Sequence, residues 1–250
     1  MKKIKNWLLS HEPFKPAHMG YWIRAHYFQW HVSSLARSRN FRYVLDAGCG
    51  TGMYSRMLAK WLPNARIHAV DILALTEWKD APHNVAFETL DLRQLEERDR
   101  YDLIVTVDVL EHIHDNADVI KRLACALRKD GYLYIAVPSE TQEQHFFPQH
   151  WFSLFHEWEE HEHIGTQHTL TQLKDIVQNT GLKLCVARHT FTFFGKLAWE
   201  VEMLLHWRGG LFGQRIRIIL MPLLKGLGWL DILLPVGTGN NLVIARKIVP

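Results

Sequence analysis

Cysteine is scarce in this sequence, and its pattern gives no sign of a disulfide scaffold. The three cysteines, Cys49, Cys125 and Cys185, are an odd number without metal-type spacing, and each lies in an apolar or loop context expected of a free thiol. This pattern favours a reducing cytoplasm. Net charge is also low, at +3, which gives no case for nucleic-acid binding by charge alone.

Long uncharged apolar runs are missing too. The apolar part of the N-terminal MKKIKNWLLS is too short for a signal peptide, and we expect an exposed or membrane-touching turn there. In the apolar segment 191–240, no uncharged stretch reaches the length of a membrane span. The zinc motif HExxH is absent as well, so no metal is predicted, although His161, His163 and His168 could converge.

The composition is typical of a globular protein. Of its 250 residues, 48% are hydrophobic and 22% are charged, which is the ordinary balance of a folded chain and not of a disordered one. This length suits one large domain or a domain with an elaboration.

The most informative stretch is residues 43–55, YVLDAGCGTGMYS. An apolar run ends at Asp46 and is followed by Gly48, Gly50 and Gly52, after which apolar positions recur with helical spacing. We interpret the segment as strand, tight loop and helix, in which glycines allow positive φ and let a ligand lie against bare backbone. Loop amides and the helix N-terminus would supply hydrogen-bond donors.

The string VLDAGCGTG resembles the first motif of the class I S-adenosylmethionine (SAM)-dependent methyltransferases. Gly52 falls one residue early for the third glycine of the NAD fingerprint, so the spacing disfavours an NAD-dependent dehydrogenase. The segment YDLIVTVDVLEHIHD, residues 101–115, resembles the fourth motif of the same family, in the small-molecule branch similar to quinone-biosynthesis O- and C-methylases.

Alternating strand and helix patterns continue along the chain and predict an α/β fold. The resemblance and the pattern together predict a Rossmann-like, doubly wound sheet of seven strands, mostly parallel, with an antiparallel last strand. A helical insertion is expected between strands six and seven. We therefore predict an N-terminal helical cap (1–40), a SAM-binding core (41–190), an apolar helical insertion (191–240) and the last core strand (241–250).

Acidic residues follow the second, third and fourth predicted strands, where open α/β sheets bind their ligands. Asp71 lies about 20 residues beyond the glycine loop and suits ribose hydroxyls of either NAD or SAM. Asp91 either reaches an adenine, as the resemblance implies, or caps a helix. The predicted cofactor-binding residues are Asp46, Gly48, Cys49, Gly50, Gly52, Asp71, Ile72, Asp91, Leu92, Asp108 and Val109.

Histidines provide the candidates for a general base, because their side chain titrates near neutral pH. His112 directly follows the fourth strand, and His163 matches in place a histidine of the resembled family. Both are predicted as catalytic. Residues 139–168 have the length of a lid or substrate-binding loop. The predicted substrate-binding residues are Tyr21, Trp22, His112, His145, His150 and His163; for Tyr21 and Trp22, packing on the sheet is the alternative.

The segment 191–240 is rich in Leu, Ile, Trp and Phe with interspersed Lys and Arg. Paired amphipathic helices on a bilayer surface or over an apolar cleft would give this pattern, as would a helical cap or a homodimer interface. The leading hypothesis is an O-directed methyltransferase acting on a small apolar or lipid-like acceptor in the cytoplasm or at the inner face of the membrane. A C- or N-methylase of a soluble intermediate, or a non-catalytic SAM-binding scaffold, are the alternatives.

Overall fold

The computed structural model describes residues 15, 17–140, 146–152 and 164–248. The chain divides into two compact units. The first unit comprises residues 1–31, 141–158 and 189–240, and the second comprises 32–140, 159–188 and 241–250. The N-terminal turn expected from MKKIKNWLLS lies outside the described residues. The predicted domain boundaries at 40, 190 and 240 stay predictions.

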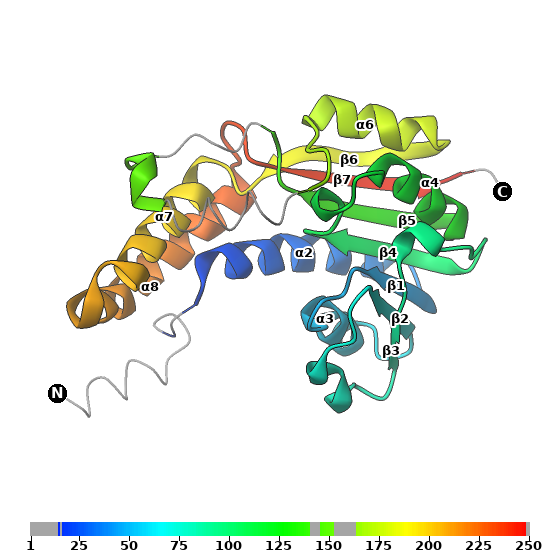
Figure 1. The fold of residues 1–250 in the computed structure, drawn as a ribbon, viewed down its shortest axis with the longest axis horizontal. Coiled ribbons are helices and arrows are strands. Elements are labelled where there is room, and N and C mark those ends of the chain that lie inside the picture. The colour runs from blue at the N-terminus through cyan, green and yellow to red at the C-terminus, as the bar shows by residue number, and fades with distance from the viewer. Residues whose placement is uncertain (1–14, 16, 141–145, 153–163, 249–250) are drawn as a thin grey trace. The chain divides into compact units, whose positions relative to one another are not determined.

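A seven-stranded sheet forms the centre of the second unit (Figure 1). The strand order is β3-β2-β1-β4-β5-β7-β6. The strands are β1 (Tyr43–Ala47), β2 (Arg66–Asp71), β3 (Val85–Thr89), β4 (Tyr101–Val107), β5 (Leu127–Val137), β6 (Leu182–Thr190) and β7 (Asn240–Lys247).

Parallel pairing joins β1 to β2 and β4, β2 to β3, and β4 to β5, whereas β7 runs antiparallel to β5. The strand order reverses between β1 and β4, which is the place where doubly wound sheets bind their ligands. This arrangement confirms the predicted Rossmann-like fold with an antiparallel last strand. β5 includes Asp130, whose φ is +68°.

Helices that precede or connect the strands complete this unit. They are α2 (Met19–Ser38), which also contributes residues to the first unit, α3 (Met53–Trp61), α4 (Asn116–Ala126) and α6 (Leu170–Asn179). Apolar side chains of α4 and α6 pack with alternate residues of the strands, such as Leu45 and Ala47, in one buried core. Because strand side chains alternate between faces, Asp46 points away from this core.

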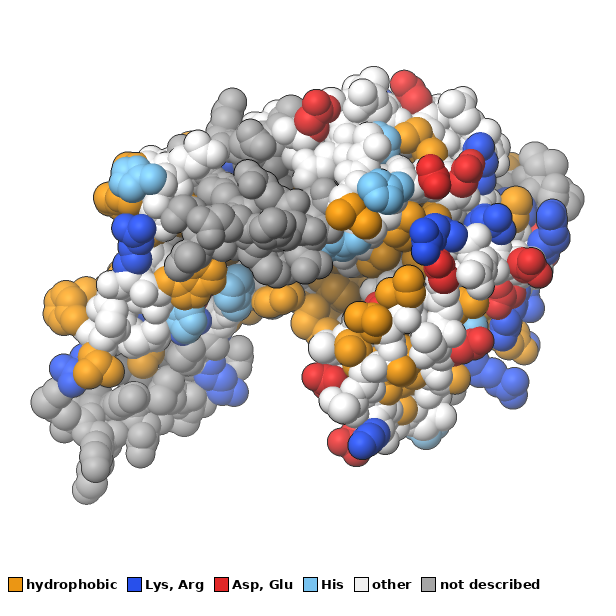
Figure 2. Space-filling view, in the orientation of Figure 1, with side chains coloured by type: hydrophobic (Ala, Val, Ile, Leu, Met, Phe, Trp, Pro, Cys, Tyr) orange, Lys and Arg blue, Asp and Glu red, His pale blue; other side chains and the backbone are white. Residues whose placement is uncertain are grey.

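The first unit contains the predicted insertion, which folds as two long helices, α7 (Phe193–Trp207) and α8 (Gly210–Leu233). With the beginning of α2, they enclose a second apolar core that includes Met19, Ile23, Trp199 and Met221. In the view of Figure 2, the described side chains visible over α7 and α8 are hydrophobic, basic or histidine. Among the described residues, no helix has both the length and the apolarity that crossing a bilayer requires.

Candidate active site

The glycine loop closes tightly over the end of β2. The backbone amides of Gly48 and Cys49 both donate to the carbonyl of Val70, at 2.8 Å each, and the amide of Gly52 donates to the carbonyl of Cys49. Gly48 and Gly52 both have φ of +81°, a conformation that L side chains rarely adopt. The strand-loop-helix prediction for this stretch is confirmed. The Cys49 side chain is buried, which raises the pKa of its thiol.

The three glycines differ in what surrounds them. A Cβ at Gly48 would lie 2.3 Å from Cγ2 of Val109, and one at Gly52 would lie 2.5 Å from the ring of Phe87. These two positions are therefore filled by the chain itself. Gly50 also has positive φ, +50°, but no heavy atom of the described residues, apart from its chain neighbours, lies within 4 Å of its Cβ position. Of the three, Gly50 is the one that leaves backbone open to a ligand.

Asp71 at the end of β2 holds this open glycine in place. Its Oδ2 accepts from the Gly50 amide at 2.8 Å and its Oδ1 accepts from the Leu73 amide at 3.2 Å. The Gly50 carbonyl accepts from the indole Nε1 of Trp78, at 2.9 Å. A carboxylate has about four lone-pair sites, so Asp71 keeps capacity for ligand hydroxyls. Ile72 and Leu73 beside it are 58% and 62% exposed and offer apolar surface to a ligand.

These contacts correct one expectation from the sequence. The amides of Gly48, Cys49, Gly50 and Gly52 were expected to act as donors to a ligand, but all four donate within the chain. At Gly50 the loop instead offers a ligand a surface without a side chain. Trp78 and Leu73 were not anticipated, since neither follows a strand end or a recognised motif directly.

Asp46 has a role in holding the loop-helix junction together. Its carboxylate is buried on the face of the sheet opposite Leu45 and accepts a 2.5 Å hydrogen bond from the Ser55 hydroxyl of α3. Burial raises the pKa of Asp46 to about 6, and the Ser55 hydrogen bond offsets part of that rise. The attraction of a positively charged ligand group by Asp46 stays a prediction.

This raised pKa predicts a pH dependence of stability. A carboxyl whose pKa is higher in the folded state stabilises the fold below its unfolded pKa, near 4, and this contribution is lost as pH rises through about 6. The variant Asp46→Asn has no carboxyl to ionise and should not lose this contribution. We therefore expect its free energy of unfolding, relative to that of wild type, to rise by about 3 kcal/mol between roughly pH 4 and 7. Urea unfolding across this pH range measures it.

The exposed Asp175 on α6 provides the control for that experiment. Asp175→Asn should change stability by only a few tenths of a kcal/mol at every pH. A stability difference between Asp46→Asn and wild type that does not vary with pH would contradict the assigned pKa.

Asp91 caps a helical turn, which was one of its two predicted roles. Its side chain accepts from the Arg93 amide at the start of η3 (Leu92–Gln94) and forms an ion pair with the Arg93 guanidinium, 2.6 Å from Oδ2. The hydrogen bond from the Arg93 side chain lowers the pKa of Asp91. The Leu92 side chain is buried in the sheet core, so a ligand contact of Leu92 would come from its backbone. Adenine binding by this pair stays a prediction.

The end of β4 presents a strained residue to the same edge of the sheet. Asp108 has φ of +54°, which is costly for a residue other than glycine and is often associated with functional sites. Val109 packs on Gly48, which brings the ends of β1 and β4 together. The turn η4 (Leu110–His112) follows, with Glu111 buried and His112 half-buried.

A polar contact not foreseen from the sequence fastens η4 to the segment after residue 163. The buried Asn116 donates to the carbonyls of Leu110, at 3.1 Å, and Thr166, at 2.9 Å, and its Oδ1 lies 2.8 Å from Nε2 of His168. Gly165 fits against the η4 carbonyls, where a Cβ would lie 2.5 Å from the Ile113 oxygen. His168, once a candidate metal ligand, is engaged here, and burial lowers its pKa.

Replacement of Asn116 by alanine is expected to destabilise the protein by about 2–4 kcal/mol, because buried partners on both segments lose their hydrogen bonds. Urea unfolding of the variant measures the loss. The exposed Asn64 supplies a matched control, since Asn64→Ala should stay within about 0.5 kcal/mol of wild type. If the two variants are equally stable, Asn116 does not hold η4 to the segment after residue 163.

The remaining predicted residues lie in the first unit or outside the described residues. His145, His161 and His163 lie outside the described residues. His150, Tyr21 and Trp22 belong to the first unit, where His150 and Tyr21 are exposed. The ring of Trp22 stacks on that of His26, with 3.8 Å between the ring centroids, and meets Trp229 of α8 edge-on, so it packs against an inserted helix.

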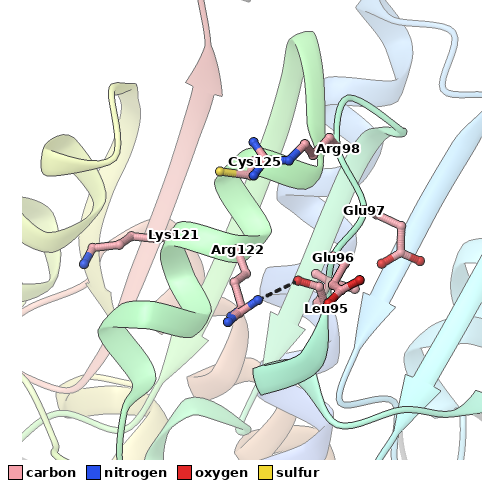
Figure 3. A pocket seen from close by; sticks show the side chains of 7 residues that line it. All are labelled: Leu95, Glu96, Glu97, Arg98, Lys121, Arg122 and Cys125. Atoms are coloured by element: carbon pink, nitrogen blue, oxygen red, sulfur yellow. Dashed lines mark hydrogen bonds between the residues drawn. The ribbon is translucent and has the colours of Figure 1, made fainter.

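A cavity of about 410 Å³ lies at a different place on the second unit (Figure 3). Its lining comes from the segment before β4 and the C-terminal half of α4, and Arg122 donates across it to the Leu95 carbonyl. Two acidic side chains, Glu96 and Glu97, and three basic ones line it, and no predicted site residue does. It lies toward the amino end of β4, away from the carboxyl strand ends where doubly wound sheets bind their ligands.

Comparison with known proteins gives one family match. The model described as "Methyltransferase domain" matches residues 19–186. The chain is 33% identical over 94 residues to the malonyl-[acyl-carrier protein] O-methyltransferase of Acetivibrio thermocellus, covering 36% of this chain and 33% of that protein. It is 24% identical over 156 residues to the ubiquinone biosynthesis O-methyltransferase of Acinetobacter baylyi, covering 56% and 60%.

These matches span from one third to three fifths of the length of the curated relatives. Among solved structures, phosphoethanolamine N-methyltransferase 2 of Haemonchus contortus in complex with S-adenosyl-L-methionine aligns with a TM-score of 0.58. Identity there is 21%, and the alignment covers 84% of this chain and 49% of that one. At this identity the likeness shows the fold alone.

Proposed function

Since this chain belongs to the class I SAM-dependent methyltransferase family, we propose that it transfers the methyl group of SAM to an oxygen atom of a small acceptor. The observation that carries the proposal is the opening at Gly50, where the Cβ position meets no atom of the described residues beyond its chain neighbours, and where the backbone lies beside the carboxylate of Asp71. A nucleoside with a charged tail fits this pairing of open loop and acidic strand end.

Within the proposal, the residues around the opening have defined tasks. Gly50 lets the methionyl part of SAM lie on the loop, and Asp71 accepts hydrogen bonds from the ribose hydroxyls. The exposed side chains of Ile72 and Leu73 cover the nucleoside. The backbone around Asp91 and Leu92 holds the adenine.

SAM supplies an activated methyl group on a sulfonium sulfur, so the protein mainly aligns the acceptor, excludes water and removes a proton. His112 follows β4 at the same edge of the sheet as the glycine loop and is proposed as the general base. His163, upstream of the anchored Gly165, is the second candidate. The two curated relatives named above are O-methyltransferases, which supports oxygen as the methylated atom.

For the acceptor we propose an apolar or lipid-like molecule, handled in the cytoplasm at the inner face of the membrane. The support is the apolar pair α7 and α8, which would make peripheral contact with the membrane. Tyr21, Trp22, His145 and His150 remain proposed acceptor contacts. A homodimer through the same helices is the alternative use of this pair.

Transfer of radiolabelled methyl groups from SAM tests the proposal directly. The protein would be incubated with a lipid extract and, separately, with an aqueous extract of the source cell. We expect labelled product in the lipid extract. Product in the aqueous extract alone would move the acceptor to a soluble intermediate, and no product in either, with SAM binding intact, would indicate a non-catalytic SAM-binding protein.

A further inference from the structure

The helix α8 exposes an apolar stripe that an ordinary surface helix would bury. Its buried side is mixed: it holds apolar residues such as Met221 together with the charged Arg217, Lys225 and Asp231, which are 9%, 7% and 0% exposed. On the opposite side, Phe212, Ile219 and Leu223 are 72%, 63% and 60% exposed. Surface helices normally bury their apolar stripe and expose the charges.

The buried charges have specific partners, so this orientation of the helix is built into the first unit. The guanidinium Nε of Arg217 lies 2.6 Å from Oε1 of the fully buried Glu202 on α7. Asp231 accepts from the hydroxyls of Tyr27, at 2.8 Å, and Thr192, at 2.7 Å, and from the Gly195 amide. Rotating α8 to hide its apolar side would break these contacts and leave buried charges unpaired, which is strongly unfavourable.

The exposed residues recur every three or four positions and so form one continuous stripe along α8. We call this stripe the outer face of α8. Its members are Phe212, Arg215, Ile219, Leu223, Gly226, Trp229 and Leu233. Leu211 and Leu234, at the ends of the helix, are also exposed. Continuous apolar patches of this kind on soluble proteins mark surfaces that bind something.

The charge around the outer face indicates what binds it. The segment 191–240 contains three acidic residues, Glu200, Glu202 and Asp231, and all three are completely buried. The exposed charges of that segment are the cations Arg208 and Arg215. A surface that is apolar with only positive charge exposed complements an anionic lipid surface, where headgroups pair with arginine and acyl chains receive the apolar side chains.

We propose that the outer face of α8 binds the surface of an anionic bilayer, with the helix lying in the plane of the interface. This deepens the membrane part of the proposed function, and it does not depend on methyl transfer. The inserting side chains are Phe212, Ile219, Leu223 and Leu233, while Arg208 and Arg215 contact lipid phosphates.

Vesicle flotation of the full chain tests this inference, with vesicles of phosphatidylcholine alone and of phosphatidylcholine mixed with phosphatidylglycerol. Wild type should float with the anionic vesicles. The double variant Ile219→Gln/Leu223→Gln should bind them at least about tenfold more weakly, because two inserting side chains become polar. Arg215→Glu should weaken binding to anionic vesicles by roughly tenfold and leave binding to neutral vesicles almost unchanged.

Ile248→Gln is the matched control, since Ile248 is an exposed apolar residue of the second unit and should not affect flotation. Circular dichroism checks that each variant is folded, and calorimetry with SAM checks the cofactor site separately. Wild type that fails to float with anionic vesicles, or a double variant that floats equally well, would overturn the inference. The inference would also be overturned if light scattering shows that wild type is a dimer and the double variant a monomer, while both bind vesicles equally well.

Discussion

Replacement of His112 by alanine is expected to lower turnover by roughly 10²- to 10⁴-fold at saturating SAM, while SAM affinity changes little. The expectation comes from position: His112 ends η4, directly after β4, and β4 pairs with the strand that carries the glycine loop. Its ring is half-buried, as suits a group that exchanges a proton with a sheltered acceptor. Methyl-transfer rates at saturating SAM, together with calorimetric SAM affinity, separate turnover from binding.

The neighbouring His114 is the control for this experiment, because it is exposed on the same loop. His114→Ala should turn over at nearly the wild-type rate. His163→Ala tests the second candidate in the same assay. If His112→Ala retains wild-type turnover and His163→Ala loses it, the base is His163; if both retain it, no general base of this kind acts in the reaction.

Substitution of Gly50 by alanine is expected to weaken SAM binding by roughly 10- to 100-fold. The added methyl group meets no protein atom within 4 Å, so it would occupy the space assigned to the ligand. The positive φ of Gly50 also makes any side chain there unfavourable, by about 1 kcal/mol in stability. Affinity is measured by calorimetry and stability by urea unfolding.

Gly210 provides a close match for the backbone effect. Its φ is +52°, against +50° for Gly50, and its Cβ position is also clear of other atoms. Gly210→Ala should therefore lose similar stability and keep wild-type SAM affinity. Equal SAM affinities of the two variants would mean that the ligand does not lie against Gly50.

The fold was predictable because its signals are local. Apolar strands end in acidic residues, glycines interrupt the pattern after β1, and helical spacing follows, so element order alone indicates a doubly wound sheet. The antiparallel β7 came from the family resemblance, whereas the helical insertion was predicted from the apolar composition of residues 191–240 with its interspersed Lys and Arg. Both are present in the structure.

The candidate site was predictable in outline but not in its contacts. The sequence identified Gly50 and Asp71, yet it could not show that Asp71 accepts from the Gly50 amide, since this bond joins residues 21 positions apart. Nor could it choose between adenine binding and helix capping for Asp91, because an aspartate suits both roles. The hydrogen bond from Arg93 to Asp91 is seen only in the structure. Asn116 escaped notice for a related reason: its partners come from segments up to 52 residues away.

Which side of α8 is buried was also beyond sequence patterns. The spacing of Leu, Ile and Arg residues predicts a helix with two unlike faces, but which face is buried depends on partners elsewhere in the chain. Glu202 and Tyr27 are those partners for Arg217 and Asp231. Their pairing holds two charged residues of α8 inside, on the same side as the apolar Met221, and leaves another apolar stripe exposed.

We propose that the loop around Gly50 and the carboxylate of Asp71 form a binding site for SAM. The decisive experiment is calorimetric titration of the purified wild-type chain with SAM, with its demethylated product S-adenosylhomocysteine and with NAD. We expect saturable one-to-one binding of the first two and none of NAD. Absence of heat with both SAM and S-adenosylhomocysteine, or preferential binding of NAD, would mean that this loop is not a SAM site.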